Sequence, residues 1–198
     1  MKKNLLITLL LLLFTANLCK SQTISIANKE PGNLESQIRN ELTLENAWID
    51  SSKENVLIVK GVLAKEDVHF IASLVKEKDI NKLDLSGSKF REIGFGLFAD
   101  CSNIKSVRLP NTVKTIAKHA FKNCGLTNIS LPTSLTSIGT ESFAGCSQLS
   151  QVTIQKKLSW IGTDAFKGCP IKSFKIKKNN EYRFDGTHLY SKNNTIIY

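Results

Sequence analysis

Four cysteines recur at one position of a repeated phrase, and their type and spacing could support disulfide, metal or thiol chemistry. Each follows a phenylalanine by three residues, in pairs that lie 23, 22 and 23 residues apart: Phe98/Cys101, Phe121/Cys124, Phe143/Cys146 and Phe166/Cys169. Zinc sites are built from C-x-x-C motifs or paired histidines, and neither accompanies these cysteines. We therefore expect no bound metal.

The fixed spacing also bears on disulfides. In a stack of repeats, the four thiols would occupy one column pointing into the core. Neighbouring strands lie about 4.8 Å apart, whereas the Cβ atoms of a relaxed disulfide lie ~3.8 Å apart. We expect free, buried thiols that act as small apolar side chains. A disulfide framework, which export would permit, is the alternative.

The histidines do not complete a catalytic pattern. His69, His119 and His188 fall on different predicted elements, and no H-E-x-x-H, G-x-S-x-G or phosphate-loop motif occurs. His119 is expected at an outward, solvated helical position. No nucleophile–base pair or carboxylate pair can be assembled, so we expect neither an enzyme nor a cofactor.

The repeated phrase predicts the elements that hold these residues. Its copies run KLDLSGSKFREIGFGLFADC, SVRLPNTVKTIAKHAFKNC, NISLPTSLTSIGTESFAGC and QVTIQKKLSWIGTDAFKGC, and a shorter fifth copy contains Phe174 and Ile176. Self-similarity at such a period is typical of a solenoid, in which each repeat completes its core against its neighbours. The apolar-x-apolar start of each copy predicts a short strand in a parallel sheet. The segment ending in Phe-x-x-Cys is predicted to form a turn of helix, capped at Thr140-Glu141 and Thr163-Asp164.

Residues 1–21 are expected to direct export. Lys2 and Lys3 precede an apolar run from Leu5 to Phe14, which is shorter than the roughly 20 residues that span a bilayer. This pattern is typical of a signal peptide cleaved before Gln22. Lipidation of Cys19 is the alternative. We therefore expect a secreted or cell-surface protein without a membrane span.

The remaining chain divides into three predicted parts. Residues 22–79 do not repeat and predict an α+β cap, with strands near 23–26 and 56–59, a helix starting at Leu34 after an Asn33 cap, and a helix over 65–76. Residues 80–176 form the solenoid. Residues 177–198 predict a hairpin turning at Asp185-Gly186, with a third strand over 195–198. The predicted fold is an α/β solenoid of about four and a half repeats with a cap at each end.

Positive charge is concentrated in the repeats. Residues 22–92 carry ten Lys/Arg and twelve Asp/Glu, whereas residues 93–198 carry fourteen and five. A basic surface attracts polyanions such as sulfated glycans or acidic proteins. Export argues against nucleic acid. Lysines that only solvate the array are the simpler interpretation.

The chain resembles the BspA-type leucine-rich repeat proteins, which are secreted or surface-attached. The resemblance covers residues 80–198 and is carried by Leu-Pro at 109–110 and 131–132, Ile-Gly at 93–94, 138–139 and 161–162, the four Phe-x-x-Cys endings, and Asp-Gly-x-x-Leu-Tyr at 185–190. It departs from the pattern at Ala117, which replaces Gly, and at Ile154-Gln155, which replaces Leu-Pro. The resemblance implies a short, right-handed leucine-rich repeat array that binds host matrix proteins or bacterial surfaces.

Departures from the repeat indicate where a partner would bind. Trp160 stands where the other copies have Glu92, Thr115 and Ser137, and exposed aromatics are enriched at binding hot spots; packing on the C-terminal hairpin is the alternative. The outward strand row Asp84, Arg108, Ser130, Thr153 and Lys175 should be basic at its C-terminal end, near Lys156 and Lys157. We predict binding of a protein or an acidic glycan through Trp160, Arg108, Lys156, Lys157 and Lys175. A structural subunit of an envelope assembly is the alternative.

Overall fold

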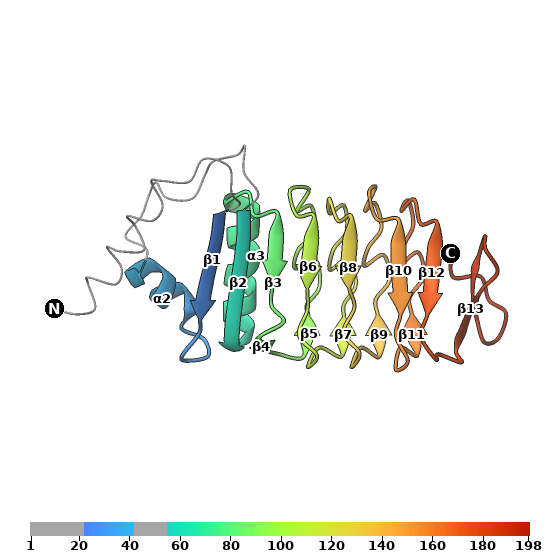
Figure 1. The fold of residues 1–198 in the computed structure, drawn as a ribbon, viewed down its shortest axis with the longest axis horizontal. Helices are drawn as coiled ribbons and strands as arrows, with labels where there is room; N and C mark the ends of the chain where they lie inside the picture. Colours follow the sequence, from blue (N-terminus) through green and yellow to red (C-terminus); the bar gives the residue numbers. More distant parts are fainter. Residues whose placement is uncertain (1–21, 42–54) are drawn as a thin grey trace.

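The computed structural model describes residues 22–41 and 55–198. The predicted signal peptide and the lipidation alternative at Cys19 lie outside these residues. In the described part, the strands lie side by side in the order of the sequence and form an elongated array, with the N-terminal strands at one end and the C-terminal hairpin at the other (Figure 1). This arrangement follows from a repeat whose apolar face is completed only by the next repeat.

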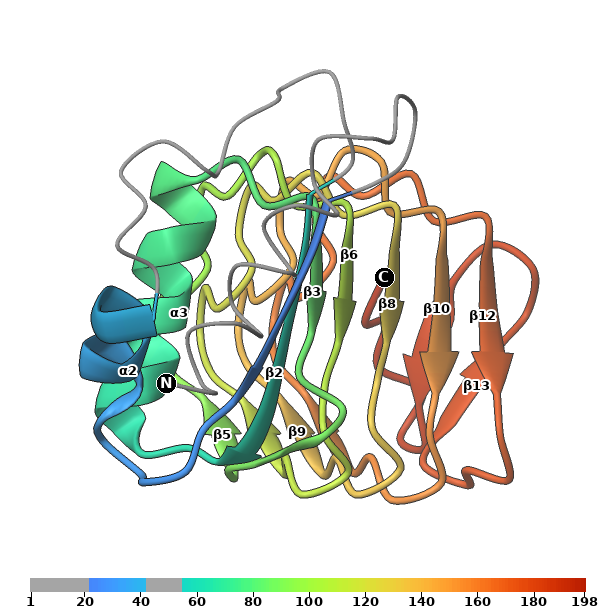
Figure 2. The same ribbon diagram turned by 60° about the vertical axis from the view of Figure 1, so that its left-hand side comes forward.

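The predicted strands form the first sheet, a row of parallel strands along one side of the array whose hydrogen bonds fall in two ladders. They are β3 (Lys82–Asp84), β6 (Ser106–Arg108), β8 (Asn128–Ser130), β10 (Gln151–Ile154) and β12 (Ser173–Ile176). Leu83 pairs with Val107 and Val107 with Ile129, whereas Val152 pairs with Phe174 in a separate ladder. β10 nevertheless lies beside β8 in both ribbon views (Figures 1 and 2). The apolar pairs point inward, as the alternation predicts.

A second sheet of two-residue strands was not predicted. Its strands are β5 (Glu92–Ile93), β7 (Thr115–Ile116), β9 (Ser137–Ile138) and β11 (Trp160–Ile161), all parallel and in register. The isoleucines of this sheet are buried and the preceding residues face outward. Each repeat therefore has two outward strand faces joined by a corner loop.

The helical turn predicted before each cysteine is wrong. These segments are turns in which Gly96, His119, Glu141 and Asp164 all have φ between 51° and 60°. This left-handed conformation interrupts helical hydrogen bonding. Alternate N–H groups instead bond to the next repeat, as in Phe98 N–H to the Ala120 carbonyl at 2.8 Å and Phe121 N–H to the Ser142 carbonyl at 2.7 Å.

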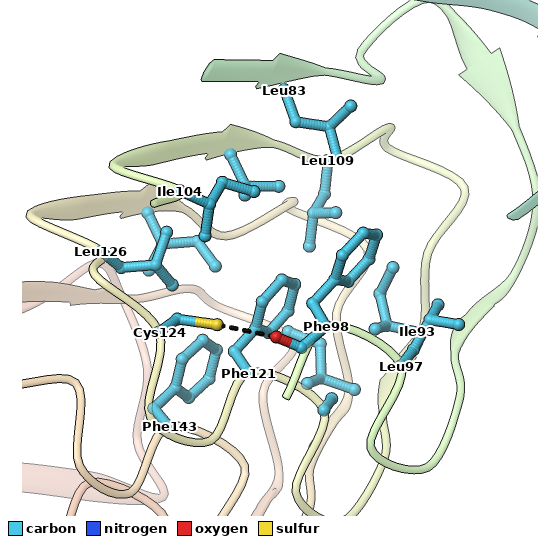
Figure 3. Packing of buried hydrophobic residues seen from close by; sticks show 14 of the residues in the cluster. Leu83, Ile93, Leu97, Phe98, Ile104, Leu109, Phe121, Cys124, Leu126 and Phe143 are labelled. Atoms are coloured by element: carbon cyan, nitrogen blue, oxygen red, sulfur yellow. Dashed lines mark hydrogen bonds between the residues drawn. The ribbon is translucent and has the colours of Figure 1, made fainter. Parts of the chain in front are cut away.

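The phenylalanines of the repeat form a continuous stack in the core. Phe98, Phe121, Phe143 and Phe166 are fully buried, with ring centroids 5.3, 5.4 and 5.5 Å apart and rings within 8° of parallel. Figure 3 shows the first three of these rings. Each stacked pair contributes about 0.5–1.5 kcal/mol beyond its area burial. The stack therefore couples each repeat to the next.

The four cysteines are free and buried, which confirms the expectation of free thiols. They also have a role that the sequence did not predict. Three of the thiols donate to the carbonyl of the phenylalanine one repeat earlier: Cys124 to Phe98 at 2.9 Å (Figure 3), Cys146 to Phe121 at 3.1 Å and Cys169 to Phe143 at 3.1 Å. The Cys101 thiol lies 3.9 Å from the Ala99 carbonyl of its own repeat. Burial raises the pKa of the Cys101 thiol to about 11 and raises that of Cys124 further. The thiols of Cys101 and Cys124 are therefore protonated at neutral pH.

The N-terminal segment extends the first sheet. β1 (Gln22–Ala27) pairs in parallel with β2 (Asn55–Val62), and β2 pairs in parallel with β3 and with the short β4 (Ser88–Lys89). The helices α2 (Leu34–Glu41) and α3 (Lys65–Glu77) lie on the same side of these strands (Figure 2). The predicted helices and strands are present, but the strands continue the repeat sheet, whereas the prediction treated this segment as a unit of its own.

A buried carboxylate joins the N-terminal elements. Asp67 accepts hydrogen bonds from the N–H groups of Gly32, Leu34 and Ala64 at 2.7–2.9 Å and from the Asn28 side chain at 3.2 Å. It therefore fixes the start of α2, a role that the sequence assigned to Asn33. The Asn33 side chain donates to Glu30 instead, at 3.4 Å.

The C-terminal hairpin forms as predicted around Asp185-Gly186. β13 (Tyr182–Phe184) pairs antiparallel with β14 (Leu189–Ser191), and Asp185 accepts from the N–H groups of Thr187 and His188 at 2.8 Å. The third strand predicted over 195–198 is reduced to one bridge, between Tyr190 and Ile196. Phe174 meets Phe166, Phe184 and Tyr198 edge to face, which ends the parallel phenylalanine stack.

Candidate interaction surface

The outward row of the first sheet contains two of the predicted binding residues. Asp84, Arg108 and Ser130 are neighbours in the strand register of β3, β6 and β8. Thr153 and Lys175 are neighbours in the register of β10 and β12. Arg108 forms an ion pair with Asp84 at 3.3 Å. Burial acts to raise the pKa of Asp84, but hydrogen bonds from Ser86 and Arg108 hold it below its ordinary value. Arg108 is thus already partnered, whereas Lys175 is exposed and has no ion pair among the described residues.

Trp160 lies on the other outward face. It opens β11 and continues the row of Glu92, Thr115 and Ser137 on the second sheet. Trp160 is 51% exposed, and no ring contact of Trp160 is found among the described aromatic side chains. The structure therefore leaves the indole accessible and does not bury it against the hairpin.

Lys156 and Lys157 occupy the corner between the two faces. They belong to the loop that joins β10 to β11, and both are exposed. The five predicted binding residues are consequently not gathered in one place. Arg108 and Lys175 lie on the first sheet, Trp160 lies on the second, and the two lysines lie on the corner that connects them.

Two neighbouring residues that sequence reasoning did not single out complete this corner. Lys178 is exposed in the following corner loop, and Asn179, which is buried, donates to the carbonyls of Gln155 at 2.7 Å and Leu158 at 2.8 Å. Lys178 follows β12 at the position that Lys156 occupies after β10, and the Asn179 side chain joins the two loops by donating to the Lys156 carbonyl at 3.5 Å. The repeat period could have indicated this neighbour, but it gives no sign of the asparagine.

A hollow among the described residues lies at the opposite end of the array. It is an open space of about 510 Å³ between α2 and α3, and its lining includes Glu35, Glu66, His69 and Glu77. Among residues 22–41 and 55–198, no group of three His, Cys, Asp or Glu side chains could hold a metal ion. No helix in this part of the chain has the length and apolar character needed to cross a membrane.

Comparisons with known proteins give a consistent family match. A model described as a BspA-type leucine-rich repeat region matches residues 73–195 in six copies. The chain is similar to a leucine-rich repeat protein of T. pallidum, with 29% identity over 64% of this chain and 54% of that one and a TM-score of 0.47. It is also similar to a leucine-rich repeat protein from Eubacterium ventriosum, with 21% identity over 68% of this chain and 42% of that one and a TM-score of 0.49.

A leucine-rich cell surface protein from Faecalibacterium prausnitzii is 17% identical over 90% of this chain and 54% of that one, with a TM-score of 0.36. The chain thus spans about half the length of the solved structures that it matches. No curated protein matches it.

Proposed function

Because this chain belongs to the BspA-type leucine-rich repeat family, we propose that it is an exported interaction module that binds a protein or an acidic glycan through the outer surface of its repeats. One observation carries this proposal. The positions that recur in every copy are buried, whereas the departures Trp160, Lys156 and Lys157 are exposed. Exposed residues that do not contribute to the core are available for contact with a partner.

The ends of the array belong to the same proposal. We infer that the repeats wind in the right-handed sense and that residues 22–79 and 177–198 cap the solenoid. Buried residues of α3, including Val68, Ile71 and Val75, cover the N-terminal end of the core. Phe184 and Tyr198 pack edge to face on Phe174 at the other end. Terminal repeats need such cover to remain soluble.

We place the mature protein outside the cytoplasm, secreted or held at the cell surface. This rests on the predicted signal peptide over residues 1–21, with a lipid anchor at Cys19 as the alternative. Mass spectrometry of the exported protein distinguishes the two, because an unmodified chain starting at Gln22 and a lipidated chain starting at Cys19 have different masses.

The proposal is tested with the exported, purified protein on panels of matrix proteins and glycans at low and high salt. We expect at least one ligand to be captured at low salt and lost at high salt, since screening weakens exposed charge pairs. Trp160→Ala and Lys156→Ala/Lys157→Ala should weaken capture. Lys118→Ala is the control, because Lys118 is exposed on a turn segment. Absence of capture in both salts, together with recovery of the protein in a stable envelope complex, would favour a structural subunit instead.

A further inference from the structure

Two consecutive corner loops at the C-terminal end lie one above the other. Gln151 pairs with Ser173 and Ile154 with Ile176, and the N–H of Lys177 donates to the Ile154 carbonyl at 2.9 Å. The side-chain amide of Asn179 also donates to the Lys156 carbonyl, at 3.5 Å, so Lys178, which precedes Asn179, lies in the loop next to that of Lys156. The basic corner, defined as Lys156, Lys157, Lys177 and Lys178, therefore presents four exposed lysines on adjacent turns.

The backbone beneath the basic corner is fixed from inside. Asn179 is 7% exposed and donates through its side-chain amide to the carbonyls of Gln155 and Leu158, at 2.7 and 2.8 Å. Its oxygen accepts from the N–H of Glu181 at 2.8 Å. One buried side chain thus joins both loops, so the four lysines project from a preorganised backbone, which lowers the entropy cost of binding.

The acidic residues of this half of the chain are engaged elsewhere. Residues 93–198 contain five acidic residues, and each has a partner outside the corner loops. Asp100 accepts from Asn123, Glu141 pairs with Lys122 and His119, Asp164 pairs with Lys167, Glu181 pairs with Lys192, and Asp185 accepts from the hairpin N–H groups. No ion pair to the basic corner is found among the described residues. Four like charges at close spacing create a positive potential that attracts an anionic ligand.

The fold does not require these charges. The corresponding corners of the two preceding copies read Pro-Asn-Thr at 110–112 and Pro-Thr-Ser at 132–134, without a charged residue. Both prolines are buried and both loops keep the same place in the array. The lysines therefore coincide with the place where Ile154-Gln155 replaces the Leu-Pro of the earlier copies.

An exposed aromatic ring lies close along the chain to these lysines. Trp160 follows Lys157 by three residues, and its side chain is half exposed on the second sheet. The apolar face of a sugar ring packs on an indole, while its sulfate or carboxylate groups meet ammonium groups. The corner is also open, which suits an extended polymer better than a small enclosed anion.

We propose that the basic corner, with Trp160 beside it, binds an anionic polysaccharide. This inference rests on the proposed function and assigns it one ligand class and one location. Lysine ammonium groups bind the sulfates or carboxylates of consecutive sugar units, and the indole packs on a ring. Arg108, which is paired with Asp84 on the neighbouring face, is not part of this site.

The test measures binding of the purified exported protein to four polymers: dextran sulfate, polygalacturonate, neutral dextran and polyglutamate. The two acidic polysaccharides distinguish sulfate from carboxylate as the recognised group. Polyglutamate carries charge without sugar rings. The variant Lys156→Ala/Lys178→Ala removes two neighbouring charges, and Lys65→Ala/Lys118→Ala is the matched control, because both control lysines are exposed on other elements.

We expect one acidic polysaccharide to bind, with affinity about five- to tenfold weaker in the corner variant and less than about twofold weaker in the control. Trp160→Ala should weaken polysaccharide binding and leave polyglutamate binding unchanged. Equal losses in both lysine variants would overturn the inference, because they indicate a response to net charge alone. Stronger binding of polyglutamate, or equal binding of neutral dextran, would also overturn it.

Failure of the inference is distinguishable from failure of the proposed function. If the protein captures a matrix protein but binds neither acidic polysaccharide, the interaction module stands and the polysaccharide site is wrong. If the protein binds neither the polymers nor any member of the ligand panels, both are wrong. Circular dichroism of each variant verifies that lost binding does not reflect unfolding.

Discussion

Replacing Phe121 by leucine tests whether the phenylalanine stack holds neighbouring repeats together. Phe121 is fully buried and has a stacked ring on each side, Phe98 at 5.3 Å and Phe143 at 5.4 Å. The change removes two stacked pairs, each contributing about 0.5–1.5 kcal/mol, and leaves a small cavity. We expect the free energy of unfolding to fall by about 2–4 kcal/mol.

Phe98→Leu is the matched control. Phe98 is equally buried but has a stacked ring on one side only, so its replacement should cost about 0.5–1.5 kcal/mol less than that of Phe121. Urea unfolding followed by circular dichroism gives both values. The double variant Phe98→Leu/Phe121→Leu should show a coupling of about 0.5–1.5 kcal/mol. Equal losses from the two single variants, or additive losses in the double variant, would refute the idea that stacking couples the repeats.

Three further predictions concern other parts of the fold. Asp67→Asn should lower the free energy of unfolding by about 2–4 kcal/mol. The Asp67 carboxylate accepts hydrogen bonds from three backbone N–H groups, and an amide would turn a donor of its own toward some of them. A thermal unfolding midpoint equal to wild type would contradict this. Gly139→Ala should destabilise by about 1–3 kcal/mol, since its Cβ would lie 2.5 Å from the carbonyl carbon of Ala117. The same change at Gly94, where a Cβ meets nothing within 4 Å, should be nearly neutral. Equal chemical denaturation curves for the two variants would contradict the close packing of Gly139 on Ala117. Hydrogen bonds from the hairpin backbone lower the pKa of Asp185 to about 2, so its contribution to hairpin stability should be complete above about pH 4 and lost as the pH falls toward 2; an NMR titration of this carboxyl with an ordinary midpoint would show that the hairpin bonds are absent.

The repeat period made much of the fold predictable. Stacked repeats place equivalent residues in columns, so the inward positions at Leu83, Val107 and Ile129 and the free thiols followed from spacing alone. The second sheet did not follow, because a strand of two residues shows no alternation. Such pairing depends on the neighbouring repeat, which local sequence does not describe.

The turns before the cysteines were assigned wrongly for a related reason. A left-handed residue is signalled by glycine at Gly96, but His119, Glu141 and Asp164 adopt the same conformation without that signal. Hydrogen bonds to the next repeat outweigh the local preference of these side chains. Thr-Glu and Thr-Asp resemble the start of a helix, so the sequence alone favoured the wrong structure.

The candidate surface was predictable as a set of residues but not as an arrangement. Departures from the repeat identified Trp160, Lys156 and Lys157, and all three are exposed. The distribution of the predicted residues over two faces depends on the corner between β10 and β11. The anchoring of that corner by Asn179 requires a contact across 21–24 residues of sequence, which no local pattern indicates.

The most direct test of the central claim is an NMR footprint of a bound ligand on the isotopically labelled protein. Regular repeat positions build the core, and we propose that the departures from the repeat bind the partner. On addition of dextran sulfate, backbone amide signals of residues 155–160 and 177–181 should shift, while those around α2 and α3 stay unchanged. Shifts centred on the hollow between α2 and α3, or shifts spread evenly over all lysine-bearing segments, would contradict it.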